Sequence, residues 1–522
     1  MLCHSEFSFR MLDSLEQSSI IFVLMLIALF IYKNSFKIIE NITFLRKMKK
    51  LPSIEPNRLL IGNLYDLWKN RSNLTEYYAS VARRNGKNRG YFVQWLSYLP
   101  ILTLTSWRYS SKILGNKKFI NRGWPAKIFS NGFDGLISLE DEVWKAHRAL
   151  LSLSFTPNVV ESFAPTVIKH VQHILADLEA SRGESLEPKA VFEQHMISII
   201  LETSVGLKNG LNDEDWLDLN NCLRSFIEAQ VNQITITNLC RDTTRRLTNW
   251  INGVKNEKVK LLEYVIRMIE LRRKEFQDEE NGKGLETTST SNRAVLNSLL
   301  RDFVHKQGGE KHIIDLKSLS SELVNIIATS YETIINSTMW FLHNMADNPH
   351  IQAKLFDELC DFDEKNEAIT ISGINELTFL DQCVKENLRI YPPVASMLRK
   401  VGKEIEIDGY SIPEGTLAAS SIYLIHHDEE IYPNPDKFDP SRFDGDSNLP
   451  SGAYIPFGDG SRRCIGERLA LFQSKIIFSN IIKRFCIIPS HTNSVKITTD
   501  FMTRPEYPLK FHFIPRHDGD RG

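Results

Sequence analysis

The chain lacks the paired cysteines on which disulfide scaffolds and thiolate clusters depend. Its seven cysteines are odd in number and scattered, which argues against a disulfide framework and for a reducing compartment. No second cysteine lies within thirty residues before Cys464. A CxxC redox pair, a four-thiolate zinc site and an iron–sulfur cluster are therefore poorly supported, and Cys464 has to be explained as a single thiol.

The chain also lacks an excess of charge of either sign. Lys and Arg total 63 against 64 acidic residues, a net charge of −1, so nothing predicts a nucleic-acid surface. A GxGxxG fingerprint for flavin or nicotinamide is missing as well, so electrons for redox chemistry have to come from another protein. With 522 residues and 42% apolar content, the chain can bury a sizeable core as several domains or as one large enzyme.

Long apolar runs are rare, and the clearest is residues 17–32, which carry no charge. As a helix they reach about 24 Å, a short but workable span of a bilayer core of about 30 Å. Acidic residues precede the run and basic residues follow it, so we expect a lumenal tail over 1–16, a transmembrane anchor over 17–32 and a cytosolic remainder. A basic, proline-containing hinge is expected over 33–63. A cleaved signal peptide is the alternative, but no small-x-small site closes the run.

What is present is a single thiol in a glycine-rich loop. Glycines at 458, 460 and 466 let the backbone approach something flat, and apolar residues recur at helical spacing from Ile465 onward. The N-terminal end of that helix favours a thiolate over a thiol. A lone thiolate suits an iron whose other ligands are not protein, which describes haem with a proximal cysteine.

The loop resembles the F-x-x-G-x-R-x-C-x-G signature of the cytochrome P450 haem-thiolate monooxygenases at all five fixed positions. The resemblance implies that Cys464 is the axial ligand of haem iron. It also implies that Phe457, Gly460, Arg462 and Gly466 bind the cofactor. The alternative for a lone cysteine is a small buried apolar residue.

Two further segments resemble the haem-propionate contacts of this family. Trp144 and Arg148 lie four residues apart on one face of a predicted helix, which on its own is typical of a core tryptophan beside a solvated arginine. In the family such a pair reaches a propionate through the indole N–H and the guanidinium. Arg399 and Arg462 align with further propionate arginines. His147, between the pair, is expected to be an ordinary histidine, either on the surface or behind the residues that contact haem.

Residues 316–345 predict one long helix that stops at Asn348-Pro349. Its apolar run is interrupted in the middle by hydroxyls and a carboxylate, which cost stability in a buried helix unless they are paired. The interruption resembles the family's A-G-x-[DE]-T segment, which crosses the distal haem face and delivers protons to iron-bound oxygen. Glu332 and Thr333 then fill the catalytic positions; a solvated helix face is the alternative.

The same segment differs from the usual family sequence at one position, and at another it lacks a residue that is typical of one subfamily. Ser330 stands where the family usually has a glycine that opens a groove in the helix. One animal subfamily carries glutamate at the position of Thr329 and esterifies it to haem. With threonine there, we expect no covalent ester.

A structural triad is implied by two more motifs. Glu386 and Arg389 lie three apart before a diproline, and Arg442 matches the arginine that completes the family's buried cluster. A bare E-x-x-R is more typical of a surface salt bridge. Between these motifs, the residues around Asp408-Gly409 predict a β-hairpin. The adjacent histidines 426 and 427 invite a metal interpretation, but they point in different directions on a strand and have no evident third ligand.

The resemblance extends from Pro52 to the C-terminus. It implies one mainly α domain with small β-sheets over residues 64–522, with haem b buried between the long helix and the cysteine loop. The implied partners are O2, a hydrophobic small molecule, the endoplasmic reticulum membrane and NADPH–cytochrome P450 reductase, with cytochrome b5 as an optional second donor and no nucleic acid. Basic residues near the loop suit an acidic reductase; they are Arg462, Arg463, Arg468 and Lys475.

The expected function is hydroxylation or epoxidation of a lipid, terpenoid, steroid or xenobiotic, with electrons that originate from NADPH. Two other classes stay open on the sequence. A haem-thiolate isomerase or dehydratase would use the same cysteine loop without a reductase, and a non-enzymatic haem binder would need no electron transfer. A thiol hydrolase is weaker, because nothing assigns Cys464 a partner histidine.

Overall fold

The structure is a computed structural model. It describes residues 39–55, 57–58, 60–71, 73–84, 90–130, 133–206, 218–219, 221–226, 254–280, 295–297, 299–300, 314–363, 371–445, 449–490, 495–499 and 502–516. The tail expected over 1–16 and the anchor expected over 17–32 lie outside these ranges. Within them, no helix combines the length and the apolar character that crossing a membrane requires.

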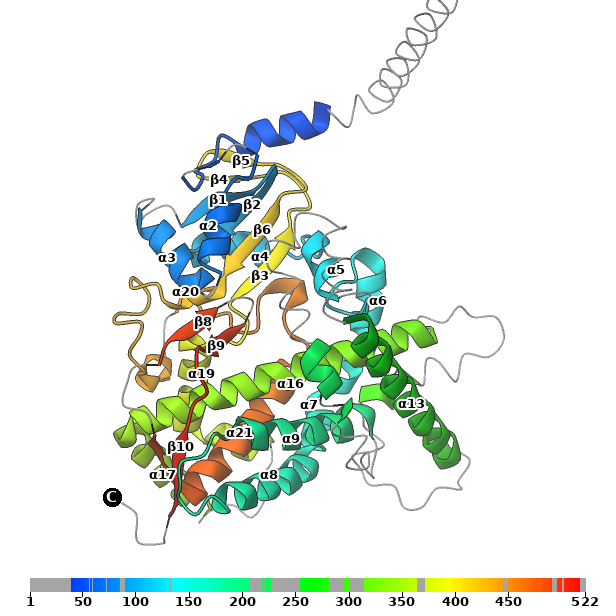
Figure 1. Cartoon of the computed structure of the whole chain (residues 1–522), viewed down its shortest axis with the longest axis vertical. Helices are drawn as coiled ribbons and strands as arrows, with labels where there is room; N and C mark the ends of the chain where they lie inside the picture. The colour runs from blue at the N-terminus through cyan, green and yellow to red at the C-terminus, as the bar shows by residue number, and fades with distance from the viewer. Residues whose placement is uncertain are drawn as a thin grey trace, which may run out of the picture.

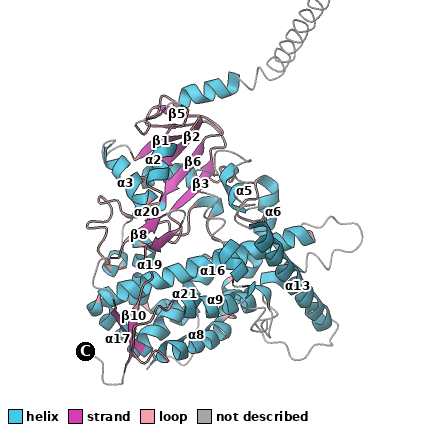
Figure 2. Cartoon of the chain, viewed as in Figure 1, coloured by secondary structure: helices cyan, strands magenta, loops and turns pink. Residues whose placement is uncertain are grey.

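The predicted fold class, mainly α with small sheets, is confirmed. A sheet lies toward one end of the molecule and packed helices toward the other (Figures 1 and 2). The helices are α2 (Leu64–Lys69), α3 (Leu74–Arg84), α4 (Trp107–Leu114), α5 (Trp124–Ser130), α6 (Asp141–Ser152), α7 (Pro157–Glu161), α8 (Ala164–Glu179), α9 (Lys189–Ile200), α13 (Val254–Glu280), α16 (Leu316–Asp347), α17 (Pro349–Asp363), α18 (Ile371–Glu376), α19 (Thr378–Ile390), α20 (Ile422–His426) and α21 (Glu467–Arg484).

The main sheet has the strand order β1-β2-β6-β3. These strands are β1 (Tyr91–Leu96), β2 (Leu99–Leu104), β6 (Leu417–Ser421) and β3 (Ser396–Lys400). β1 pairs with β2 and β3 pairs with β6 in antiparallel fashion, whereas β2 and β6 are parallel, with Thr103 opposite Ala419. Every residue of β1 is buried, which explains why its sequence shows no polar alternation.

Three two-stranded sheets complete the fold. The hairpin predicted around Asp408-Gly409 is formed by β4 (Ile405–Ile407) and β5 (Tyr410–Ile412), and both turn residues have positive φ, 49° and 76°. Two positive φ values in a two-residue turn match the right-handed twist of the strands. The others pair β7 (Phe485–Pro489) with β10 (Phe511–Pro515), and β8 (Ile497–Thr499) with β9 (Thr503–Pro505).

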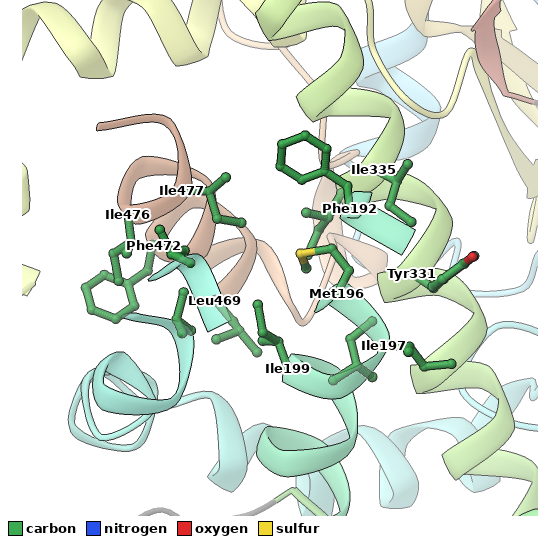
Figure 3. Close-up of a cluster of buried hydrophobic side chains, with 14 of the residues drawn as sticks. Phe192, Met196, Ile197, Ile199, Tyr331, Ile335, Leu469, Phe472, Ile476 and Ile477 are labelled. Carbon is green, nitrogen blue, oxygen red and sulfur yellow. The ribbon is translucent and has the colours of Figure 1, made fainter. Parts of the chain in front are cut away.

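The predicted long helix is α16, which crosses the helical half (Figure 1). It begins where the Asp315 side chain accepts a hydrogen bond from the Ser318 N–H over 2.7 Å, and it ends before Pro349. Apolar side chains of α9, including Phe192 and Met196, pack in a core shared with α16 and α21 (Figure 3). Burying one such side chain stabilises the fold by about 1.5–3 kcal/mol.

The packed fold starts before α2. Residues 39–48 are helical, and Met48, Leu51 and Ile54 are buried against the sheet end of the molecule. Ser53 forms an isolated parallel bridge to Val93 in β1. The described part of the expected hinge is therefore attached to the sheet rather than free of it.

Candidate functional site

Cys464 lies on a loop that connects Phe457 to α21. The N–H of Cys464 donates to the carbonyl oxygen of Phe457 over 2.9 Å, and the short 3-10 turn η4 (Gly460–Arg462) lies between them. The Cys464 side chain has exposed area although protein atoms surround it closely. It therefore lines a space inside the fold.

Two glycines of this loop are required by packing against protein. Gly460 has φ 66°, and a Cβ there would lie 2.2 Å from the carbonyl oxygen of Leu114 in α4. Gly458 has φ 75°, and its Cβ would lie 2.5 Å from the sulfur of Met397 in β3. A flat ligand, which the sequence suggested as the reason for these glycines, is not needed to explain them. At Gly466 a Cβ would meet nothing closer than 3.9 Å, and one of the nearest atoms is the Cys464 sulfur.

Burial raises the pKa of the Cys464 thiol above its usual value. The N–H of Gly466 and the charges of Arg148 and Arg122 lower that pKa, but they do not outweigh burial. The expectation that a helix start favours the thiolate thus captured a real but smaller contribution. A coordinated metal ion deprotonates a thiol outright, so the thiolate form depends on bound iron.

Four arginines form a cluster of positive charge close to this thiol: Arg122, Arg148, Arg399 and Arg462. Burial lowers the pKa of Arg122 to about 10, of Arg399 to about 9 and of Arg462 to about 8, and it lowers that of Arg148 as well. Their mutual repulsion adds to the effect, since Arg122 lowers the pKa of both Arg399 and Arg462. Buried like charges are unfavourable unless an anion compensates them.

Several donors around this cluster lack acceptors. The indole N–H of Trp144 and the Nε of Arg399 are buried and find no hydrogen-bond partner among the residues that the structure describes. The guanidinium groups of Arg122 and Arg148 form no hydrogen bond or ion pair with the described residues. A ligand with two carboxylates would satisfy both the charge and the donors, and the two propionates of haem b are such groups. The residues present therefore fit haem.

Arg462 makes contacts with protein in addition to the propionate contact that the resemblance implies, since three hydrogen bonds leave two of its five N–H donors available. Its guanidinium donates to the carbonyl oxygens of Ile120 at 2.6 Å and Leu136 at 2.9 Å, and also to that of Leu139. Its Cζ lies 4.2 Å from the centre of the Trp144 ring. Arg462 thus ties the cysteine loop to the segment before α6 and contributes charge to the cluster.

Arg122 is the functional candidate that sequence reasoning missed. It lies two residues after Ile120, whose carbonyl oxygen accepts from Arg462, and just before α5. This stretch has no helical or strand periodicity. Its charge influences the pKa of Cys464, Arg399 and Arg462. No motif marks it, and only the three-dimensional cluster identifies it.

The predicted catalytic pair lies on the one face of mid-α16 that is not fully buried. Residues 319–325, 327, 328, 331 and 334–346 are buried, whereas Ile326, Thr329, Ser330, Glu332 and Thr333 retain accessible surface. An accessible stripe in a helix that is otherwise buried indicates a cavity along it.

The hydroxyls of this stripe bond back to their own helix. Thr333 Oγ1 donates to the Thr329 carbonyl oxygen over 2.7 Å, and Thr329 Oγ1 donates to that of Asn325 over 2.6 Å. The α-helical pattern of α16 continues without interruption past Ser330. The groove that a glycine would open at that position is not seen.

Glu386, Arg389 and Arg442 are brought together as a buried ionic cluster. Glu386 accepts from Arg389 Nε at 2.7 Å and from Arg442 Nε at 3.3 Å, and both Glu386 and Arg389 are fully buried. Burial raises the pKa of Glu386, and the two arginines oppose that shift. Arg389 also donates to the carbonyl oxygens of His426 and Pro435. The cluster therefore ties α19 to the segment that leads into the cysteine loop.

The adjacent histidines His426 and His427 lie among protein groups and help to hold the fold together. His426 accepts a hydrogen bond from the Ile455 N–H over 2.9 Å, and burial lowers the pKa of His426 and of His427 to about 3. No group of three potential metal-ligating side chains is arranged for a metal ion in the described ranges. Of the two places expected for His147, the surface is excluded because the residue is buried, with its Nδ1 2.6 Å from Oε1 of the buried Glu322.

The basic surface expected for a reductase is only partly exposed. Lys475 is buried and its Nζ lies 2.7 Å from Asp381, and Arg462 is buried as described above. Arg463 and Arg468 are exposed. Next to Cys464 lies a cavity of about 510 Å³, whose lining includes Asp381 and Lys475.

Comparison with known proteins identifies the family. Residues 52–513 match the family model for cytochrome P450. The chain belongs to the cytochrome P450 family. It is 26% identical to cytochrome P450 3A15 of Cavia porcellus over 413 residues, which cover 73% of this chain and 76% of the relative. It is 28% identical to cytochrome P450 4A12B of Mus musculus over 368 residues, 69% and 70% of the two chains.

A solved structure agrees on the fold. Retinoic acid bound cyanobacterial CYP120A1 superposes with a TM-score of 0.73 and 19% identity, covering 89% of this chain and 100% of that one. As a cytochrome P450, the protein is a haem-thiolate monooxygenase that uses haem and electrons derived from NADPH through a reductase.

The triad generates a stability prediction. Replacing Arg389 with Ala leaves the buried Glu386 carboxylate without its main partner, so we expect the free energy of unfolding to fall by about 3–5 kcal/mol. Arg484→Ala is the control, because it breaks an exposed pair with Glu179 and should cost less than about 1 kcal/mol. Denaturant unfolding measures both. Equal losses in the two variants would contradict the role given to the triad.

The loop glycines generate a second prediction. Gly460→Ala adds a clash with Leu114 to the backbone strain of a positive φ, so the loop has to shift and haem content should fall. Gly415→Ala is the matched control: its φ is 85°, but a Cβ there meets no atom within 4 Å. It should cost about 1–2 kcal/mol and leave haem content unchanged. Haem per protein in purified samples is the measurement, and full haem content in Gly460→Ala would refute the packing argument.

Proposed function

We propose that this cytochrome P450 is a membrane-bound enzyme of the endoplasmic reticulum, with its catalytic domain in the cytosol, that hydroxylates or epoxidises a hydrophobic small molecule such as a lipid, terpenoid, steroid or xenobiotic. The observation that carries the proposal is the convergence of one thiol, two buried arginines (Arg399 and Arg462) and two partly buried ones (Arg122 and Arg148) on a single site. Bound there, haem supplies a thiolate-ligated iron at which O2 is activated.

The residues of the chain divide the work as follows. Cys464 would provide the sulfur ligand of the haem iron, and Phe457, Gly460 and Gly466 shape its loop. Trp144, Arg148, Arg399 and Arg462 would hold the propionates, with Arg122 as a further partner, and Arg462 also links the loop to the segment before α6. Glu332 and Thr333 hold and pass protons on the accessible face of α16. Glu386, Arg389 and Arg442 keep the loop in position.

Exposed apolar side chains support attachment to a membrane. They lie at the end of the molecule that carries the main sheet, in helix 39–48, the loop before α2, α2 itself and the β1–β2 turn (Figure 1). The Ser97 hydroxyl donates to the Leu60 carbonyl oxygen, so the loop and the turn are neighbours. In a chain whose residues 17–32 are expected to anchor it, an apolar patch of this kind would lie against the bilayer. Its members are Ile39, Ile42, Leu60, Ile61, Tyr65, Trp68 and Tyr98.

The thiolate predicts an absorption signature. Reduced protein with bound CO should absorb at about 450 nm, and Cys464→Ser should abolish this band and turnover together. Cys360→Ser changes another free cysteine and should leave both unchanged. A band retained in Cys464→Ser would exclude this residue as the ligand.

Electron supply separates the proposal from its main alternative. A monooxygenase forms product only with NADPH, reductase and O2, whereas an isomerase or dehydratase forms product without them. Compounds that shift the spin state of the haem, screened among fatty acids, terpenoids, steroids and xenobiotics, are the substrates to use. Product formed under nitrogen without NADPH would refute the monooxygenase assignment for that substrate.

The residue at position 329 predicts extractable haem. Thr329 has no carboxylate to form an ester, and its hydroxyl is engaged with the Asn325 carbonyl oxygen. Acid butanone should therefore remove the haem completely and intact. Haem retained by the denatured protein would show a covalent link and contradict this prediction.

A further inference from the structure

The carboxylate assigned to proton delivery is held by an arginine from a distant part of the chain. Oε1 of Glu332 lies 3.1 Å from Nε of Arg504, within ion-pair distance, and the same oxygen accepts a hydrogen bond from Asn336 Nδ2 over 3.2 Å. The side chains retain 14% and 25% of their accessible surface, so the pair is partly shielded from water. Such pairs interact more strongly than exposed ones.

The β8–β9 hairpin positions Arg504 beside Glu332. Its neighbour Thr503 is fully buried and is fixed by three hydrogen bonds. The indole N–H of Trp340 in α16 donates to the Thr503 carbonyl oxygen over 3.1 Å. Thr503 itself donates to the carbonyl oxygens of Pro392 and Pro393, over 2.7 and 3.1 Å. The strand therefore cannot slide along α16 without breaking these contacts.

The other strand of the hairpin is anchored as well. The Thr499 hydroxyl accepts a hydrogen bond from the Thr75 N–H at the start of α3 over 2.9 Å, and Thr499 is buried. The hairpin thus connects α3, α16 and the chain after α19. Arg504 has a rigid support, which a residue needs in order to orient a partner.

The pair also decides where the Glu332 carboxylate points. The Thr333 hydroxyl donates to the Thr329 carbonyl oxygen, and no hydrogen bond joins Glu332 to Thr333 in the described residues. Without Arg504, the single hydrogen bond from Asn336 would be left to orient the carboxylate. Proton transfer depends on such orientation before it depends on acidity.

We propose that Arg504 is a positioning residue that sets proton delivery by holding Glu332 on the β9 side of α16. The inference rests on the proposed role of Glu332. It goes beyond it by assigning control of that carboxylate to the C-terminal hairpin. In this proposal Arg504 acts on the reaction through Glu332.

The first experiment tests the ion pair without using catalysis. Unfolding free energies of the haem-containing protein are measured for Arg504→Gln, Glu332→Gln and the double variant. We expect the double variant to be less destabilised than the sum of the single variants, because the second substitution has no partner left to lose. The same cycle on the exposed pair Arg83 and Glu76 is the control, and it should be close to additive. Additive losses at Arg504 and Glu332 would overturn the proposal.

The second experiment measures proton delivery with NADPH, O2 and reductase alone. Reduction of O2 to hydrogen peroxide consumes one NADPH and to water consumes two, so the ratio of NADPH to O2 consumed reports how far reduction proceeds. We expect Arg504→Gln and Glu332→Gln each to lower the ratio of water to peroxide by about tenfold, which corresponds to about 1.4 kcal/mol. The double variant should be no worse than either, and Arg504→Lys, which keeps the charge, should recover much of the loss.

The outcomes separate this inference from the function on which it rests. If Glu332→Gln lowers the ratio and Arg504→Gln does not, Arg504 has no positioning role. If Arg504→Gln lowers the ratio further in the Glu332→Gln background, it acts by another route and the inference fails. If Glu332→Gln has no effect while CO-bound protein keeps its band at about 450 nm, the relay role of Glu332 fails although the haem site stands.

Discussion

Uncompensated positive charge inside the protein is the constraint on which the site depends. Arg122, Arg148, Arg399 and Arg462 lie close together: Arg148 lowers the pKa of Arg122, and the other three arginines lower the pKa of Arg462. Among the described residues, no carboxylate pairs with Arg122 or Arg148, and no acceptor is bonded to the Trp144 N–H. The like charges therefore lower the stability of the protein without ligand, and an anionic ligand would compensate them. Binding haem and completing the fold are, in energy terms, one process.

The buried ionic cluster at Glu386 is the opposite case. Its carboxylate and guanidinium groups satisfy one another and reach further to backbone carbonyl oxygens of the segment before the cysteine loop. One cluster is complete without a ligand and fixes the loop, whereas the other is incomplete and recruits the cofactor. Arg462 belongs to both the cysteine loop and the arginine cluster, and it bonds the loop to the Ile120 carbonyl oxygen. This arrangement lets the protein hold the thiol in place before iron arrives.

Local sequence signals predicted much of the fold and of the candidate site. The features that could not be predicted depend on contacts between residues far apart in sequence. The cysteine motif, the long helix, the turn at Asp408-Gly409 and the Glu386 triad each depend on residues close in sequence or on fixed motif spacing. Arg122 has no such signal, since its importance arises from neighbours hundreds of residues away. The carbonyl partners of Arg462 and the contact between Gly460 and Leu114 are equally distant in sequence. The pairing of Glu332 with Arg504 could not be predicted either, because it depends on how a C-terminal hairpin docks on α16.

The parallel pairing of β2 with β6 has a consequence for biosynthesis. It joins residues near 100 to residues near 420, and the cluster around Cys464 likewise gathers groups from 122, 148, 399 and 462. Contacts between residues so far apart in sequence form late in folding. Closing a large loop costs conformational entropy before the contacts that stabilise it can form. A nascent chain on the ribosome has no place for haem until almost all of it has been made. Loading of the cofactor accordingly requires almost the whole chain, and a chain cut short before the cysteine loop would lack both Cys464 and Arg462 and would leave the other three arginines and their apolar surroundings exposed.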